Sequence, residues 1–154
     1  MSTKTILRSR KFFLSSVFIS AMLLSAAASS GDKQKQELDA QQLQQAIKKF
    51  TGGAKLLKSE AVTLWTPNIA EAGHIVPVHI KSSLDRVEQV AVLVGGNPKP
   101  LAATYRIPAG NMSVLKSQVK MRGTNQIVAI VKANGKYYQA SKKVKVTIGG
   151  CGGG

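Results

Sequence analysis

The chain has 154 residues, of which 44% are hydrophobic and 19% are charged, and its formal net charge is +15 at pH 7. This length suits one domain with a sizeable hydrophobic core, and the excess of Lys and Arg favours anionic partners. The basic residues are scattered along the chain, without a long run or an aromatic-interleaved stripe. A nucleic-acid-binding protein is therefore not indicated.

Residues 1–28 have the pattern of a secretory signal peptide. A basic segment precedes a charge-free, apolar stretch over residues 12–28, which ends in the A-x-A cleavage site Ala26-Ala27-Ala28. This stretch is shorter than the roughly 20 apolar residues that a membrane-spanning helix needs, so cleavage is favoured over a membrane anchor. The basic residues are Lys4, Arg8, Arg10 and Lys11.

The same segment bears on the export route and on the charge of the mature chain. Residues 9–14 read SRKFFL, close to the twin-arginine pattern S-R-R-x-F-L, with Lys11 in place of the second arginine. Both the twin-arginine and the general secretory route therefore stay open. Removing the four basic leader residues from the 22 of the whole chain leaves 18 basic and 7 acidic residues, a net charge of about +11.

Residues 32–50 predict one amphipathic helix within an N-terminal helical segment, 29–53. The stretch lacks Gly and Pro and is rich in helix formers. Thr51-Gly52-Gly53 supplies a glycine stop. We expect the apolar face to pack on a partner or on the domain itself; its members are Leu38, Leu43, Ala46, Ile47 and Phe50.

Residues 54–148 predict a mainly β domain, an immunoglobulin-like sandwich of about seven strands, because short runs rich in Val, Ile and Thr alternate with turn residues. Asn134-Gly135 between two alternating segments is a strong hairpin signal. A single cysteine rules out an intersheet disulfide, so the core must hold by packing, with Trp65 expected as its largest side chain. The last strand is expected to bury one face, because apolar and polar residues alternate along Val144, Lys145, Val146, Thr147 and Ile148.

The C-terminal segment 149–154, GGCGGG, holds the chain's single cysteine, Cys151. Its glycine neighbours cannot bury the thiol, so it is either an intermolecular disulfide partner or a reactive thiol. A disulfide needs positioned Cα atoms, whereas a carrier arm needs reach and a thin cross-section, which glycines provide. The three residues from Ile148 to Cys151 span at most about 10 Å, enough to place the sulfur inside the cleft of another protein.

No catalytic or metal-binding set is evident, so neither enzymatic activity nor a cofactor is expected. The two histidines, His74 and His79, are five residues apart and would point to opposite faces of an extended segment. The acidic residues are few and dispersed, and the Gly95-Gly96 loop precedes no helix that could bind a phosphate. A thiol enzyme would need a base held near Cys151, which such a tail cannot hold.

Several sequence blocks, in order along the mature chain, are similar to those of one known family. They are AIKKFTGGA, PNIAEAGHIVPVHI, NPKPLAATYRIPAGN and QIVAIVKANGKYYQASKKVKVTIGGCGG. The chain resembles the SoxY family, the cysteine-bearing subunit of the sulfur-oxidising (Sox) thiosulfate carrier SoxYZ. It departs from the family pattern at Lys11, in the additional Gly154 and in its more basic composition.

The resemblance implies a periplasmic carrier of sulfur compounds that is not itself an enzyme. In the family, the cysteine corresponding to Cys151 is joined oxidatively to thiosulfate by the haem enzyme SoxAX, giving a cysteine S-thiosulfonate. The hydrolase SoxB then releases sulfate, and the sulfane dehydrogenase SoxCD oxidises the remaining sulfur. The residues that match the family's flexible arm are Gly149, Gly150, Gly152 and Gly153.

The resemblance also implies a heterodimer with a small all-β SoxZ-like subunit that has no signal of its own, and hence export of a folded pair. For the partner surface, we expect a sheet face or edge together with the helix around Ile47 and Phe50. The alternative function is a structural or adhesive immunoglobulin-like exported domain that forms an intermolecular disulfide through its tail.

Overall fold

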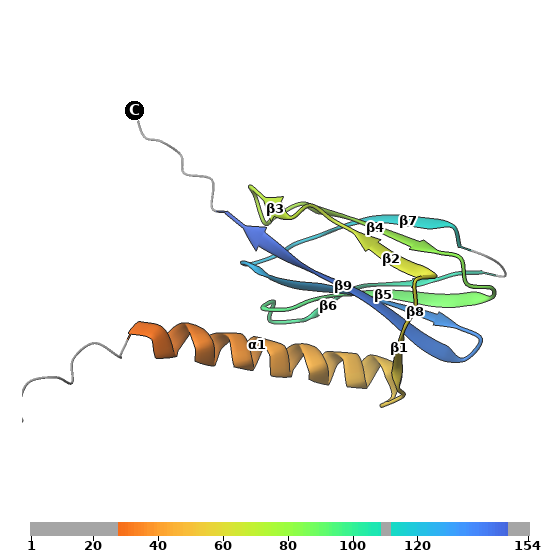
Figure 1. The fold of residues 1–154 in the computed structure, drawn as a ribbon, viewed down its shortest axis with the longest axis horizontal. Helices are drawn as coiled ribbons and strands as arrows, with labels where there is room; N and C mark the ends of the chain where they lie inside the picture. Colours follow the sequence, from red (N-terminus) through yellow and green to blue (C-terminus); the bar gives the residue numbers. More distant parts are fainter. Residues whose placement is uncertain (1–27, 109–111, 148–154) are drawn as a thin grey trace, which may run out of the picture.

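The computed structural model describes residues 28–108 and 112–147, and the side chains from residue 31 onward. Residues 1–27 of the predicted signal peptide, Ile148 and the cysteine arm lie outside the described residues, and Ala28 is the first residue of the described helix. The described part contains one helix, α1 (Ala28–Thr51), and nine strands (Figure 1). The strands are β1 (Leu56–Lys58), β2 (Val62–Trp65), β3 (Ile69–Ala70), β4 (Val76–Ser82), β5 (Val87–Val94), β6 (Leu101–Arg106), β7 (Val114–Val119), β8 (Asn125–Ala133) and β9 (Lys136–Val146).

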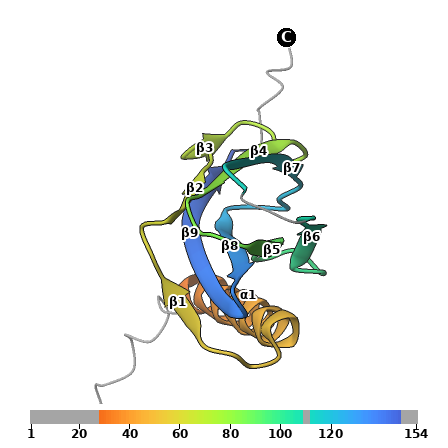
Figure 2. The same cartoon turned by 90° about the vertical axis from the view of Figure 1, so that its right-hand side faces the viewer.

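Two sheets pack face to face, and α1 forms a third layer outside the larger sheet (Figure 2). The larger sheet has the order β1-β9-β8-β5-β6, with β3 added beside β9, and the smaller sheet has the order β2-β4-β7. This order of the antiparallel strands is that of an immunoglobulin-like sandwich. The predicted fold class is confirmed. The described part has nine strands where about seven were expected, because β1 and β3 are additional short strands that pair with β9 in parallel.

The core between the sheets follows from strand alternation. On β4, Val76, Val78 and Ile80 face inward and are fully buried, while their neighbours face outward. The central strands β5 and β8 are instead buried on both faces, because α1 covers their outer side. A second apolar cluster results, in which Leu43 and Ile47 of α1 pack on residues Ala91, Leu93, Val128 and Ile130 of the sheet.

The predicted glycine stop at the end of α1 is confirmed. The helix ends at Thr51, and Gly52 and Gly53 have positive φ angles of 65° and 82°. The peptide N–H of Gly53 donates a hydrogen bond to the carbonyl oxygen of Lys48 at 3.0 Å. This is the six-residue closure of a Schellman motif, which satisfies a carbonyl that the helix leaves unpaired.

The predicted hairpin at Asn134-Gly135 is also confirmed, with φ angles of 50° and 70° between β8 and β9. Glu88 of β5 supports it from the neighbouring strand, since its carboxylate accepts hydrogen bonds from the peptide N–H of Gly135 at 2.8 Å and from Nζ of Lys132 at 2.7 Å. These contacts, that with Lys132 first, lower the pKa of Glu88 below its usual range. The same hydrogen bond and charge raise the pKa of Lys132.

Three expectations about side-chain position are wrong. Trp65 is 52% exposed, because β2 alternates and it is Val62 and Leu64 that face the core. Leu38 is 53% exposed, since it lies five residues, or roughly 140° of helix rotation, before Leu43.

The third correction concerns the expected partner surface on α1. Ile47 is 5% exposed, and Phe50 is half-buried with its ring edge-on to the ring of Tyr137. This part of the helix therefore packs on its own domain and leaves only part of the Phe50 ring available to a partner.

Candidate functional site

Strand β9 carries the chain out of the sandwich toward Cys151. It pairs with β8 along most of its length, from Asn125↔Val144 to Ala133↔Lys136. On its other side it pairs with β1 at one end and with β3 at the other. A strand bonded on both sides is a rigid support, because most of its backbone donors and acceptors are engaged.

The last residues of the described chain are held by hydrogen bonds from β3 and its flanks. The peptide N–H of Lys145 donates to the carbonyl oxygen of Asn68 at 2.9 Å, and that of Thr147 donates to the carbonyl oxygen of Ala70 at 3.0 Å. The hydroxyl oxygen of Thr124 accepts from the peptide N–H of Val146 at 3.0 Å. The chain is therefore fixed as far as Thr147.

Thr147 is the last described residue before the thiol, and the number of residues between them limits how far the thiol can lie from this support. Cys151 is four residues beyond Thr147, and four residues span at most about 14 Å when fully extended. The reach of about 10 Å predicted from the sequence is counted from Ile148, which lies outside the described residues. The thiol and its glycines, Gly149, Gly150, Gly152 and Gly153, lie outside the described residues, so their assigned roles stay predictions.

Three loops surround the point where β9 ends, and we call this region the arm end. It comprises residues 71–75, 95–100 and 120–124 together with the end of β9 (Figure 1). Asn97 joins two of the loops, since its amide donates to the carbonyl oxygen of Lys120 at 2.7 Å and accepts from the peptide N–H of Arg122 at 3.1 Å. Two of the loops of the arm end are therefore held together by hydrogen bonds.

Gly73 holds the remaining loop against the loop of residues 120–124. Its carbonyl oxygen accepts a hydrogen bond from the peptide N–H of Met121 at 2.6 Å. A Cβ at position 73 would collide with the Met121 carbonyl oxygen and would lie 3.1 Å from the side chain of Val146. The loop approaches the backbone this closely only because residue 73 is glycine.

The surface of the arm end is apolar beside β9 and basic around it. Ile69 and Ile75, which flank the residue 71–75 loop, are each 55% exposed. Exposed basic side chains outnumber the single exposed acid of these loops, Glu71; they are Lys99, Lys120, Arg122 and Lys145. Such a platform suits an anionic cargo or an acidic partner surface.

The two histidines do not meet. His74 is exposed in the loop before β4, whereas His79 lies on β4 with its ring stacked on Trp65. Within the described ranges, no three His, Cys, Asp or Glu residues are grouped so as to hold a metal ion.

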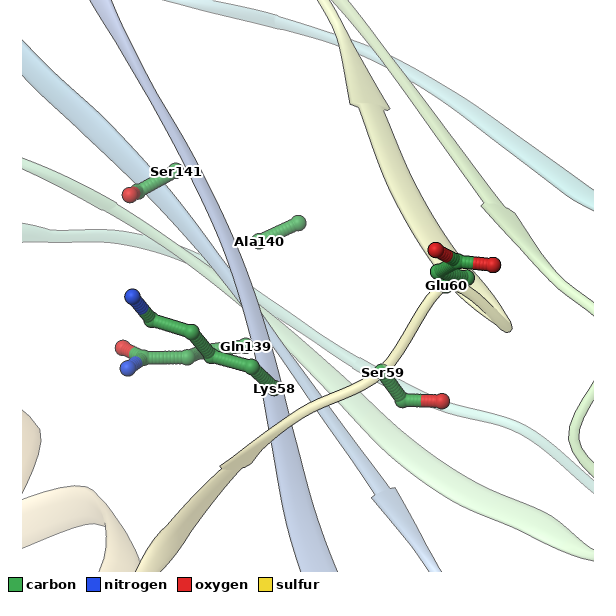
Figure 3. A pocket seen from close by; sticks show the side chains of 6 residues that line it. All are labelled: Lys58, Ser59, Glu60, Gln139, Ala140 and Ser141. Carbon is green, nitrogen blue, oxygen red and sulfur yellow. The ribbon is translucent and has the colours of Figure 1, made fainter.

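A shallow pocket between β1 and β9 has no catalytic set either. Lys58, Ser59 and Glu60 line it from one side, and residues 139–141 line it from the other. In Figure 3 the Glu60 carboxylate lies on the opposite side from the Lys58 and Gln139 side chains. No acid–base pair therefore converges on this pocket.

Sequence reasoning missed the groups that fix the base of the arm. Thr124 stands in a turn segment and carries no periodic signal, and Asn68 and Ala70 contribute carbonyl oxygens of the backbone, which every residue possesses. Only the pairing of the two-residue strand β3 with β9 reveals their role.

No helix within residues 28–108 or 112–147 is long and apolar enough to cross a membrane.

The fold and sequence of the chain match proteins of sulfur oxidation. The sulfur carrier protein SoxY from Chlorobium limicola f thiosulfatophilum is 28% identical, with a TM-score of 0.66 over 74% of this chain and 99% of that one. A putative superoxide reductase from Thermotoga maritima has a TM-score of 0.52 at 12% identity, over 59% of this chain and 93% of that one, a likeness of fold alone. Curated proteins give no match. The family described as "Sulfur oxidation protein SoxY" matches residues 47–151, which include the end of α1 from residue 47 to 51, the whole sandwich and Cys151, and the chain therefore belongs to the SoxY family.

Proposed function

We propose that this protein is a covalent carrier of sulfur intermediates in thiosulfate oxidation, with the sulfur held on Sγ of Cys151. The observation that carries this proposal is the firm anchoring of β9 as far as Thr147, four residues before the cysteine in a glycine sequence. A thiol at the end of a short tether on a rigid base can enter another protein's cleft while the sandwich stays outside. The family match, which extends to Cys151, supports the same reading.

The chemistry needs oxidation when the cargo is attached. The thiol and thiosulfate together give up one proton and two electrons when they are joined, so that Cys–SH and S₂O₃²⁻ give Cys–S–S–SO₃⁻, one H⁺ and two electrons. A haem enzyme of the SoxAX type accepts these electrons. Water then cleaves the bond between the outer sulfur and the SO₃ group in a hydrolase of the SoxB type, giving the persulfide anion Cys–S–S⁻, sulfate and two protons.

The carrier itself contributes presentation rather than catalysis. The residues next to Cys151 in the sequence are glycines, which cannot activate the thiol, and the reactivity of a cysteine depends on its thiolate form. Activation therefore belongs to the docked enzyme. The partners are SoxAX, SoxB and, where present, SoxCD, each of which takes its turn at the arm, together with a SoxZ-like subunit that stays bound.

The predicted signal peptide and the family point to the periplasm as the site of action. The basic arm end is consistent with handling anions there, because thiosulfate, the thiosulfonate and sulfate are all negatively charged.

The test is the intact mass of the mature protein taken from its native compartment, with and without reductant. A carrier shows a reductant-sensitive addition of thiosulfate or sulfur mass that is absent from Cys151→Ser. A clean thiol, or a homodimer mass alone, after feeding with thiosulfate and the partner enzymes would instead favour the adhesive domain. Gly150→Pro separates the two further, because a stiffened tether slows enzyme turnover and leaves a passive disulfide unaffected.

A further inference from the structure

One outer face of the sandwich is covered by α1, and the other is not covered by any described element. The outer face of the larger sheet packs against α1, so its apolar residues are buried. On the smaller sheet, the outward positions of β2, β4 and β7 have no element of the described chain above them (Figure 2). This uncovered face carries the single tryptophan of the protein, Trp65.

Strand register defines the composition of this face, which we call the Trp65 face. One row across the sheet contains Trp65, His79 and Lys116, and the next contains Thr63, Lys81 and Val114. The Trp65 and His79 rings stack with centroids 4.7 Å apart and an interplanar angle of 26°. Val114 is 43% exposed beside them. The face is therefore an ordered aromatic and aliphatic platform.

The charges of the Trp65 face have one sign. Lys81 and Lys116 are exposed, and the outward positions of the three strands include no Asp or Glu. A second copy of this chain would bring lysines against lysines across a two-fold axis, which opposes self-association. A complementary partner instead offers an apolar pocket for the indole, bordered by carboxylates.

We propose that the Trp65 face binds the partner subunit that stays permanently bound to the carrier, and that this subunit contributes an apolar surface bordered by carboxylates. This inference rests on the proposed function, since it takes the partner to be the SoxZ-like subunit. The position supports a constant occupant: Trp65 pairs with His79 in the middle of β4, whereas the arm end lies beyond the Val76 end of that strand. A subunit on this face leaves the arm end free for the enzymes that take turns at Cys151.

The experiment mixes the mature chain with the SoxZ-like subunit of the same organism. Binding is followed by sedimentation and by tryptophan emission, from which the emission of the subunit alone is subtracted; Trp65 is the only tryptophan that this chain contributes. We expect a 1:1 complex in which the emission shifts to shorter wavelength. Trp65→Ala should weaken the complex about 30-fold, as expected for a central aromatic anchor, and Lys116→Glu should weaken it about tenfold or more by reversing a charge. The matched control is Leu101→Ala, because Leu101 is also a large exposed apolar residue, on the edge strand of the other sheet.

Two results would overturn the proposal. If Trp65→Ala and Lys116→Glu bind the subunit as tightly as the wild type does, the subunit binds elsewhere on the chain. A homodimer of the isolated chain that Trp65→Ala dissociates makes a second copy the occupant. Cys151→Ser separates this question from the carrier function: it should bind the subunit normally while losing all sulfur-mass additions. If the Trp65-face variants bind the subunit normally while the wild type still acquires sulfur mass, only the proposed interface is refuted and the carrier function is retained.

Discussion

The length of the tether should determine whether partner enzymes can use the thiol. Since the chain is held as far as Thr147, Cys151 can be displaced by at most about 14 Å from the last anchored Cα. Deleting Gly149 and Gly150 halves this limit to about 7 Å. If the reacting sulfur must enter a cleft, the shortened arm misplaces it by several ångströms, and a misplacement of about 1 Å already costs up to 100-fold in rate.

The matched control lengthens the arm by two glycines inserted after Gly150. A six-residue tether dilutes the thiol at its target, and the effective concentration falls with about the −3/2 power of length, which is roughly twofold here. Deletion and insertion therefore have unequal expected effects. The deletion should lower kcat/KM at least about 100-fold, whereas the insertion should lower it about twofold.

The assay is the rate of thiosulfate conjugation by a SoxAX-type enzyme at subsaturating carrier. Reaction of the thiol with a small disulfide reagent measures its intrinsic reactivity. Both variants should retain it, because neither places a charged residue beside Cys151: the deletion leaves Ile148 before it and the insertion leaves glycine. A deletion variant that is conjugated within twofold of the wild-type rate would refute the reasoning. The thiol would then react at the protein surface, without entering a cleft.

Further predictions concern stability, measured by urea unfolding. Ile47→Ala should cost about 2–4 kcal/mol, because it opens a cavity under α1, whereas the exposed Leu38→Ala should stay within about 0.5 kcal/mol of the wild type; equal effects would contradict the packing of the helix. Gly73→Ala should cost about 1–3 kcal/mol, because its Cβ meets backbone, while Gly123→Ala, with nothing within 4 Å, should be neutral or slightly stabilising. Glu88→Gln should be less stable than the wild type at pH 6. Because folding lowers the pKa of Glu88, its stabilising contribution is complete above its ordinary pKa of about 4.3 and is lost as the pH falls through the lower pKa of the folded state. The difference should therefore shrink as the solution is made acidic; a difference that stays constant down to acid pH would refute the assignment.

Much of the fold could be predicted because its signals are local. Gly52-Gly53 and Asn134-Gly135 adopt the positive φ angles that their residue types favour, and the longer strands alternate visibly. Strands β1 and β3, with three and two residues, are too short for any period. They exist because β9 offers them a free edge, which is a property of the assembled sheet.

The position of Trp65 shows that strand alternation predicts burial better than side-chain size does. Its volume suggested the core, but Val62 and Leu64 occupy the inward positions of β2, and in a strand the residue next to an inward one faces out. The site divides in the same way. Cys151 and its glycines are visible as a motif, whereas the Thr124 hydroxyl and the β3 carbonyls that fix Thr147 depend on tertiary pairing.

A carrier that serves several enzymes needs one surface that is always available and another that can be permanently occupied. The arm end meets the first need, since its exposed charges are mostly basic and surface charge speeds encounter more than it strengthens binding. Weak, fast docking suits a carrier that must leave each enzyme after one step. The Trp65 face meets the second need, because a buried aromatic anchor lowers the rate of dissociation. The two requirements conflict on a single surface, and the sandwich separates them by placing the thiol at a strand end and the tryptophan on a sheet face.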